Sequence, residues 1–311
     1  MKRGIIQSRG LGDIIIALPI ARHYYNQGDE IHWPICEEFH SSVRDSVPWV
    51  TWHPIPTDTQ GRFFLERPLE IFQEQGVDID EALYLYQYLS SHPEHTDPEL
   101  FAVMKFDQYK YWAAAVPFLD KWTLKDCITR FPDREKALAK KLKLKGPYAV
   151  AHLTGSDCRA NLDINWLENL AIVNVDDHLT DSIFDWLGVL EGAEAFVGID
   201  SVFANLVDSY QIDIPQKYWL RRSSWDLTPV LGSSWTMIPN GQNLTDPQRI
   251  VIADAVNQKN KALTARAAPA PTAAPQPIPQ SSKPQSSHLR SSVPFQSNQN
   301  YPSDFMSVMK K

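Results

Sequence analysis

The chain has 311 residues, 43% of them hydrophobic, which is enough to build the cores of two domains of ordinary size. Its net charge of −7 at pH 7 excludes the overall basic bias that is typical of general nucleic-acid binders. Its three cysteines, Cys36, Cys127 and Cys158, are odd in number and far apart, which argues against a disulfide framework or a zinc site and favours a cytoplasmic protein.

The first half of the chain alternates short apolar segments with amphipathic ones. Residues 4–8 predict a strand, followed by a glycine turn and a helix over residues 13–27. Glu30–Cys36 predicts a second strand, and Pro34 favours an edge or irregular position because proline lacks the N–H of a central strand. Further elements are predicted as a helix at 38–47, a strand at 50–55, a helix at 63–75 and a strand at 81–89. This alternation indicates βαβ units and a parallel sheet.

A second alternating set begins after a linker at residues 146–147. Before it, the aromatic residues of the stretch 98–117 have helical spacing, which favours a core over a binding platform. Strands are predicted at 148–153, 171–175 and 195–199, and helices at 134–145, 166–170, 183–191 and 202–210. Thr245 and Pro247 predict the start of a final helix that runs to about residue 263.

The composition changes at residue 265, where Ala, Pro, Ser and Gln replace large apolar residues. Such a segment buries too little surface to offset its ordering entropy, so we expect it to be disordered. The predicted parts are therefore a Rossmann-like domain at 1–146, a second at 147–264 that includes the final helix, and a tail at 265–311.

The turn between the first strand and the first helix contains Gly10, Gly12 and Asp13. A helix start offers free N–H groups and a positive dipole end, which suit an anionic or polar ligand. The turn also places Asp13 at the carboxyl end of a strand, where open α/β sheets bind ligands. Asp13 is thus a candidate general base, although its residue type and position alone favour a helix cap.

Three segments together resemble the GT-B glycosyltransferases of the heptosyltransferase type, which move a sugar from a nucleotide donor. The first is Gly12-Asp13, followed by an apolar stretch and Leu18-Pro19. The second runs from Leu190 through Gly192-Ala193 and a strand to Asp200-Ser201. The third is His152-Leu153-Thr154-Gly155-Ser156-Asp157-Cys158-Arg159, with Trp166 after it. The resemblance covers roughly residues 4–263 and is weak in the middle.

The resemblance implies a GT-B fold, an α/β fold in which two Rossmann-like domains face a cleft, the first for the acceptor and the second for the nucleotide sugar. It implies that Asp13 is the general base that takes the proton of the acceptor hydroxyl. The residues that it implies for binding the nucleotide-sugar donor are Gly10, Gly12, Thr154, Gly155, Arg159, Asp200, Ser201 and Val202. No metal ion or other cofactor is expected.

Two positions depart from the family pattern, since Val202 stands where the family has glycine and Asn205 where it has histidine. A non-catalytic nucleotide-sugar-binding protein on the same scaffold is therefore a second hypothesis. A third is a dinucleotide-binding oxidoreductase, because Gly10-x-Gly12 follows a strand, although Ile15 replaces the third glycine of that motif.

The acceptor is left open between a saccharide, a protein and modified DNA. The triplet Asp78-Ile79-Asp80 has the form of a magnesium site, but it lies in the first domain, away from the expected nucleotide-sugar donor. No apolar run approaches the roughly 20 residues that span a bilayer, so we expect no stable membrane insertion.

Overall fold

The structure is a computed structural model that describes residues 1–56, 62–87, 95, 98–155, 160, 162–175, 179–220, 229–232 and 234–238. By their mutual contacts, these residues belong to one compact unit, Met1–Asn257. The predicted final helix and the predicted tail lie outside the described residues.

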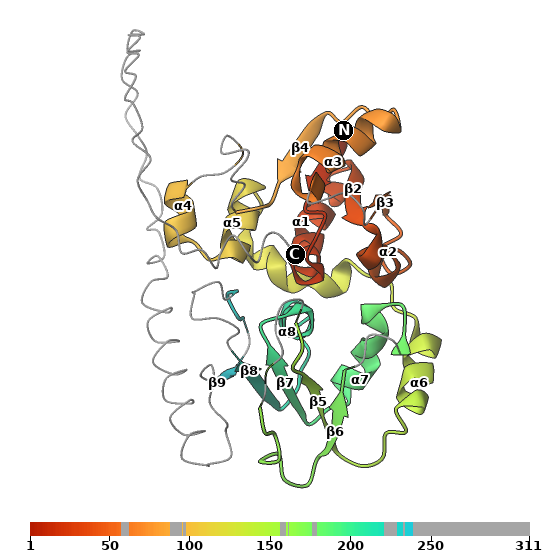
Figure 1. Ribbon diagram of the computed structural model, residues 1–311, viewed down its shortest axis with the longest axis vertical. Coiled ribbons are helices and arrows are strands. Elements are labelled where there is room, and N and C mark those ends of the chain that lie inside the picture. Colours follow the sequence, from red (N-terminus) through yellow and green to blue (C-terminus); the bar gives the residue numbers. More distant parts are fainter. Residues whose placement is uncertain are drawn as a thin grey trace, which may run out of the picture. The chain divides into compact units, whose positions relative to one another are not determined.

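The first half forms a parallel sheet in the order β3-β2-β1-β4 (Figure 1). Its strands are β1 Lys2–Ile6, β2 Glu30–Cys36, β3 Val50–Ile55 and β4 Glu81–Tyr84. The segments between them form α1 Leu11–Asn26, α2 Glu37–Val43, the 3-10 helix η1 Arg62–Phe64 and α3 Glu66–Glu74. The predicted βαβ alternation is confirmed here, with two strands at the predicted bounds.

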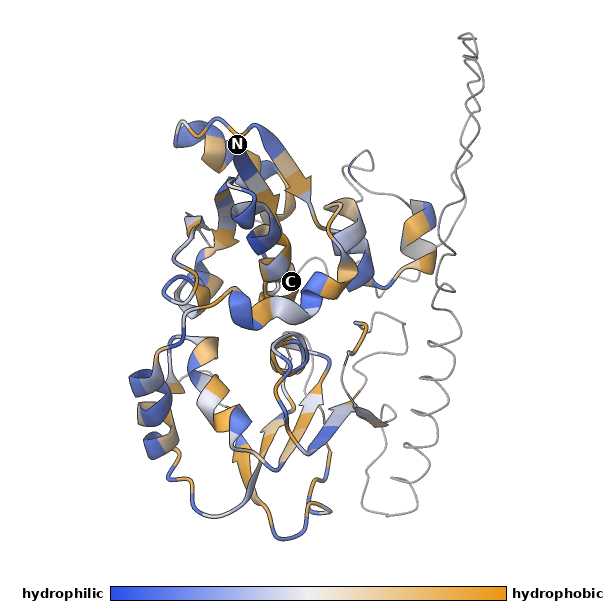
Figure 2. Cartoon of the chain, turned by 180° about the vertical axis from the view of Figure 1, so that it is seen from behind, coloured by the Kyte–Doolittle hydropathy of each residue, from blue (hydrophilic) through white to orange (hydrophobic). Residues whose placement is uncertain are grey.

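The second half forms another parallel sheet, in the order β6-β5-β7-β8-β9. Its strands are β5 Tyr148–His152, β6 Ala171–Asn174, β7 Ala195–Ile199, β8 Gln216–Leu220 and β9 Thr236–Ile238. Its helices are α6 Pro132–Lys141, the 3-10 helix η5 Ile183–Trp186, α7 Leu187–Glu191 and α8 Val202–Ser209. In Figure 2 the central strands of this sheet are mainly hydrophobic and α6, which packs on α7 and η5, is mainly hydrophilic, as expected for a buried sheet and a surface helix.

Three short helices connect the two sheets: α4 Pro98–Val103, α5 Phe106–Ala113 and the 3-10 helix η3 Phe118–Asp126. The prediction that the aromatic residues of 98–117 belong to the core is confirmed in part, because Tyr109 and Tyr111 are buried. Trp112 is half exposed.

Helix α1 is the central helix of the molecule, since every residue from Ile14 to Ala21 is buried. A helix that is apolar all round must be covered on all sides. It contacts α5, η3 and α8, and one hydrophobic core includes α1, residues of both sheets and Phe203 of α8. Within the described chain, no helix combines the length and the apolar character needed to cross a membrane.

The predicted edge position of Pro34 is wrong, because β2 lies between β1 and β3. The pairing with β1 ends at Gly4 and His32, two residues before Pro34, whereas Pro34 pairs with His53 of β3. The proline is therefore tolerated in an inner strand where the ladder with β1 is interrupted, as the alternative of an irregular position expects, and Cys36 N–H donates to the Ser8 carbonyl beyond it over 2.9 Å.

The predicted helix at 166–170 is also wrong, because this segment forms successive turns. Asn165 N–H donates to the Asp163 carboxylate over 2.9 Å, and Asn169 has a φ of +68°. A left-handed residue cannot continue a right-handed helix, so the turns end there. Strands β8 and β9 were not predicted; the burial along β8 does not alternate, and β9 has three residues.

Candidate active site

Both sheets have a switch point, where the strand order reverses, and open α/β sheets bind ligands at the carboxyl ends of the strands there. In the first sheet it lies between β1 and β4, and in the second between β5 and β7. The turn from β1 to α1 and the loops that follow β5 and β7 are thus the places for a site. The predicted site residues that the structure describes lie in these turns.

Asp13, in the first turn of α1, forms an ion pair with Lys110 of α5. The distance from Asp13 Oδ1 to Lys110 Nζ is 3.0 Å, and the side chains are 37% and 3% exposed, respectively. Lys110 Nζ also donates to Gln7 Oε1 over 2.6 Å and to the Leu85 carbonyl over 2.9 Å. The three N–H bonds of the ammonium therefore face three acceptors. Lys110 was not predicted as a functional residue, because its segment has the pattern of an aromatic core.

The backbone before Asp13 is held by Tyr86. The Tyr86 hydroxyl accepts hydrogen bonds from Ser8 N–H over 2.9 Å and from Arg9 N–H over 3.2 Å. The side chain of Gln7 donates to the Arg9 carbonyl over 2.8 Å. Burial raises the pKa of Tyr86 above its usual range, so the phenol stays protonated and neutral.

The two predicted glycines allow close approaches, Gly10 to the Asp13 carboxylate and Gly12 to α8. Gly10 is the N-cap residue of α1 with a φ of +82°, and α1 has no side-chain cap there. A Cβ on Gly10 would lie 2.6 Å from Asp13 Oδ2, and a Cβ on Gly12 would lie 3.1 Å from Asn205 Nδ2 and 3.4 Å from Val202 N. The start of α1 therefore adjoins the start of α8.

The second switch point contains a buried histidine that bonds to the N-cap of α8. The His152 Nδ1 atom lies 2.7 Å from Ser201 Oγ, and the His152 ring packs against Phe203 at 4.7 Å. Burial lowers the pKa of His152 to about 4, so this imidazole is neutral at pH 7. Ser201 makes no side-chain cap with α8, so its hydroxyl does not occupy the first N–H groups of the helix.

The other predicted donor-binding residues flank this point. Thr154 is exposed and Gly155 is half-buried, directly after β5, while Asp200 and Val202 flank Ser201. Arg159 lies outside the described residues. The structure thus brings Gly10, Gly12 and Asp13 together with Val202, through the contact between α1 and α8.

Asn205, which stands where the resembling family has histidine, is buried against Gly12 and is 4% exposed. Its Oδ1 atom has no hydrogen-bond partner among the described residues. The departure from the family pattern therefore lies one helical turn into α8, directly against the turn that carries Asp13.

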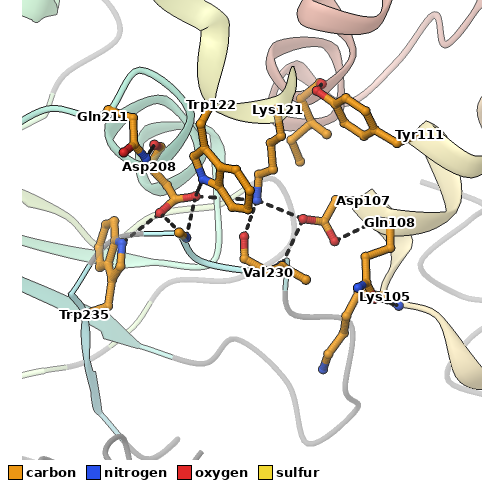
Figure 3. A network of polar contacts seen from close by, with 12 residues as sticks. Lys105, Asp107, Gln108, Tyr111, Lys121, Trp122, Asp208, Gln211, Val230 and Trp235 are labelled. Carbon is orange, nitrogen blue, oxygen red and sulfur yellow. Dashed lines mark hydrogen bonds and ion pairs between the residues drawn. The ribbon is translucent and has the colours of Figure 1, made fainter. Parts of the chain in front are cut away.

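A second buried cluster of charges joins the two halves of the chain (Figure 3). Lys121 Nζ lies 2.8 Å from Asp107 Oδ2 and 3.5 Å from Asp208 Oδ2, and all three side chains are fully buried. Lys121 also donates to the Val230 carbonyl. Because no member of this cluster is open to a ligand, its role is to hold α5, η3 and α8 together; the sequence pattern did not predict it.

Among the described residues, no group of three or more His, Cys, Asp or Glu side chains is arranged to hold a metal ion. Of the triplet at 78–80, Asp80 has a structural contact, because its carboxylate accepts a hydrogen bond from Lys2 N–H over 2.7 Å.

In fold, the chain is similar to Escherichia coli ADP-heptose LPS heptosyltransferase II, with a TM-score of 0.51 and 14% identity over 86% of this chain and 99% of that one. Two further structures match with lower TM-scores. They are E. coli heptosyltransferase WaaC with ADP-2-deoxy-2-fluoro heptose (0.45; 13% identity; 85% and 100% of the two chains) and the family 9 glycosyl transferase of Veillonella parvula (0.48; 12%; 85% and 97%). No protein-family model and no curated protein matches the chain. The likeness to the first structure confirms the expected GT-B fold, in a chain of widely divergent sequence.

Proposed function

We propose that this protein is a glycosyltransferase that moves a sugar from a nucleotide-diphosphate donor to an acceptor hydroxyl, with Asp13 as the general base. The observation that carries the proposal is the position of the part-exposed Asp13 carboxylate. It is paired with Lys110 at the switch point of the first sheet, and its turn adjoins the start of α8, which follows the switch point of the second sheet. The reaction needs a base that takes the proton of the acceptor hydroxyl and a group that stabilises the negative charge of the departing diphosphate. A carboxylate next to a helix N-terminus supplies both.

In the proposed reaction, the acceptor hydroxyl gives its proton to Asp13 while its oxygen bonds to the anomeric carbon of the sugar. The bond from that carbon to the diphosphate breaks, and its electron pair leaves with the nucleoside diphosphate. The N–H groups at Ser201 and Val202 stabilise the departing charge. We propose that Gly10, Gly12, Thr154, Gly155, Arg159 and Asp200 complete the donor site, without a metal ion.

The substrates to test follow from the structural neighbour. The first donor is ADP-heptose and the first acceptor is lipopolysaccharide, because the E. coli protein of similar fold is named for both. Other nucleotide sugars, and then protein and modified DNA as acceptors, follow. We propose the cytoplasm as the compartment, since Cys36 and Cys127 are free buried thiols.

The test is Asp13→Asn, which keeps the shape of the side chain but removes the base. We expect a loss of about 10²–10⁴-fold in turnover, which is typical for a general base, while calorimetry finds the affinity for the nucleotide sugar retained. The matched control is Asp133→Asn, which makes the same change at a fully exposed side chain of α6. An Asp13→Asn enzyme within a few-fold of the wild-type rate would show that Asp13 is not the base.

A non-catalytic nucleotide-sugar-binding protein is the second candidate, favoured by Val202 and by the buried Asn205 in α8. This candidate predicts that nucleotide sugars bind without transfer or hydrolysis. Binding of NAD in the same titrations, with no binding of nucleotide sugars, would instead support the oxidoreductase.

A further inference from the structure

We infer that Lys110 is a positioning residue that fixes the Asp13 carboxylate and leaves its Oδ2 atom as the proton acceptor. The inference rests on the proposed function, since it assigns a task within that reaction. It concerns a residue that lies 97 positions from Asp13 in the sequence and comes from a different element, α5.

The ammonium of Lys110 is held from three sides. Its acceptors come from the end of β1, from the first turn of α1 and from the residue after β4: Gln7 Oε1, Asp13 Oδ1 and the Leu85 carbonyl. A lysine ammonium has three N–H groups and no acceptor, so three contacts in different directions use all of them. The position of Lys110 Nζ is thereby fixed relative to β1 and β4, the strands that border the switch point. Lys110 Nζ in turn fixes the position of Asp13 Oδ1.

The burial of Lys110 indicates that its positive charge is needed for a specific contact. An ammonium with 3% of its side chain exposed costs free energy unless it is paired and hydrogen-bonded. Its neighbours on α5, Tyr109 and Tyr111, are buried aromatic residues, so Lys110 places a charge in an otherwise largely apolar part of the helix. Of its three partners, only Asp13 is charged, so the ion pair with Asp13 is the contact that compensates the buried ammonium.

The two oxygens of the carboxylate are thus distinguished. Oδ1 bonds to Lys110, while Oδ2 lies over Gly10, at 2.6 Å from the place that a Cβ would take. Since Gly10 has no side chain, nothing from that residue covers Oδ2. In the reaction proposed above, the proton of the acceptor hydroxyl then goes to Oδ2, and Lys110 keeps its proton throughout.

The experiment is a double-mutant cycle of Lys110→Met and Asp13→Asn, with kcat, the KM for the nucleotide sugar and calorimetric affinity measured for each protein. A misplaced reacting group costs up to about 10²-fold in rate, so we expect kcat to fall by about 10- to 100-fold in Lys110→Met, with KM and affinity within threefold. In the Asp13→Asn background the same change has no further effect on kcat, because no base is left to position. The matched control is Lys136→Met, at an exposed lysine of α6, with wild-type kinetics.

The double variant also protects the test against misfolding, because it leaves neither charge buried alone. A Lys110→Met protein with kcat within threefold of the wild type would overturn the inference, as would an equal further loss in the Asp13→Asn background. If instead Asp13→Asn itself keeps the wild-type rate, the proposed base is wrong, and the role of Lys110 falls with it. The cycle therefore separates the two failures.

Discussion

At the scale of single residues, His152 has an environment that makes the stability of the fold depend on pH. Its imidazole is buried, bonded to Ser201 and packed on Phe203. Burial lowers its pKa from 6.5 to about 4. Between these two pH values the unfolded chain binds a proton at His152 that the folded chain does not, so the free energy of unfolding falls as the pH is lowered.

We predict that His152 alone removes about 3 kcal/mol of folding free energy between pH 6.5 and pH 4, since one pKa unit corresponds to about 1.4 kcal/mol. His152→Gln, which is neutral throughout, should show a weaker pH dependence in urea titrations over this window. His53, whose pKa is also lowered by burial, contributes equally to both proteins and cancels in the comparison. Parallel pH curves for the two proteins would contradict a buried neutral His152.

The residues of the candidate site differ in how far the sequence predicts them. Asp13 could be found because its turn is local, a strand followed by two glycines and an apolar helix within 20 positions. Lys110 could not, because its contact with Asp13 depends on how α5 packs beside α1 and carries no local pattern. The same holds for Lys121, whose partners Asp107 and Asp208 are 101 positions apart.

At the scale of elements, the apolar periodicity predicted most strands and helices of both sheets, because each is a locally continuous pattern. It failed where a local hydrogen bond or a special backbone conformation decides the structure, as at Asn169. It also failed for β8, whose burial does not alternate along Gln216–Leu220, and for β9, whose three residues are too few to show a period.

Helix α1 offers a matched pair of substitutions at its two ends. Gly10 and Gly28 have φ angles of +82° and +94°, so alanine is strained at both, by roughly 1–2 kcal/mol. Only at Gly10 does the new Cβ meet another group, Asp13 Oδ2 at 2.6 Å; at Gly28 nothing lies within 4 Å.

We therefore predict that both Gly10→Ala and Gly28→Ala lower the thermal midpoint, Gly10→Ala by more because it disturbs the ion pair of the buried Lys110, and that only Gly10→Ala lowers kcat, by at least tenfold. The displaced Asp13 carboxylate is the reason. Calorimetric unfolding and steady-state kinetics of the two proteins give the comparison. Equal kcat values would mean that the geometry of Asp13 at the start of α1 does not matter for turnover.

At the scale of the whole molecule, the two sheets are joined by more than the chain between them. A single hydrophobic core includes residues of both halves. Within it, Asp208 of α8 accepts hydrogen bonds from Trp122 of η3, from Gly232 N–H and from Trp235, and pairs with Lys121 (Figure 3). Helix α5 takes part in both clusters, through Asp107 to Lys121 and through Lys110 to Asp13. The lysine that pairs with the candidate base and an aspartate of the contact between the halves thus lie on one short helix, α5.

The last prediction follows from the donors that surround Asp208. Both of its oxygens accept N–H groups, Oδ1 from Gly232 and Trp235 and Oδ2 from Trp122. In Asp208→Asn, the amide NH2 must face at least one indole N–H whichever way it is turned, and Lys121 loses a carboxylate, so we expect a loss of about 3 kcal/mol in the free energy of unfolding. Asp213→Asn, the same change at an exposed side chain of the second half, should cost less than about 0.5 kcal/mol.

Urea unfolding followed by tryptophan fluorescence and by far-UV circular dichroism measures the free energy of unfolding of both variants. Coincident transitions that shift together to lower urea would mean that the halves unfold as one unit through this cluster. A loss confined to fluorescence, with the circular dichroism transition unchanged, would mean that the cluster is a local contact and that the hydrophobic core alone joins the two sheets.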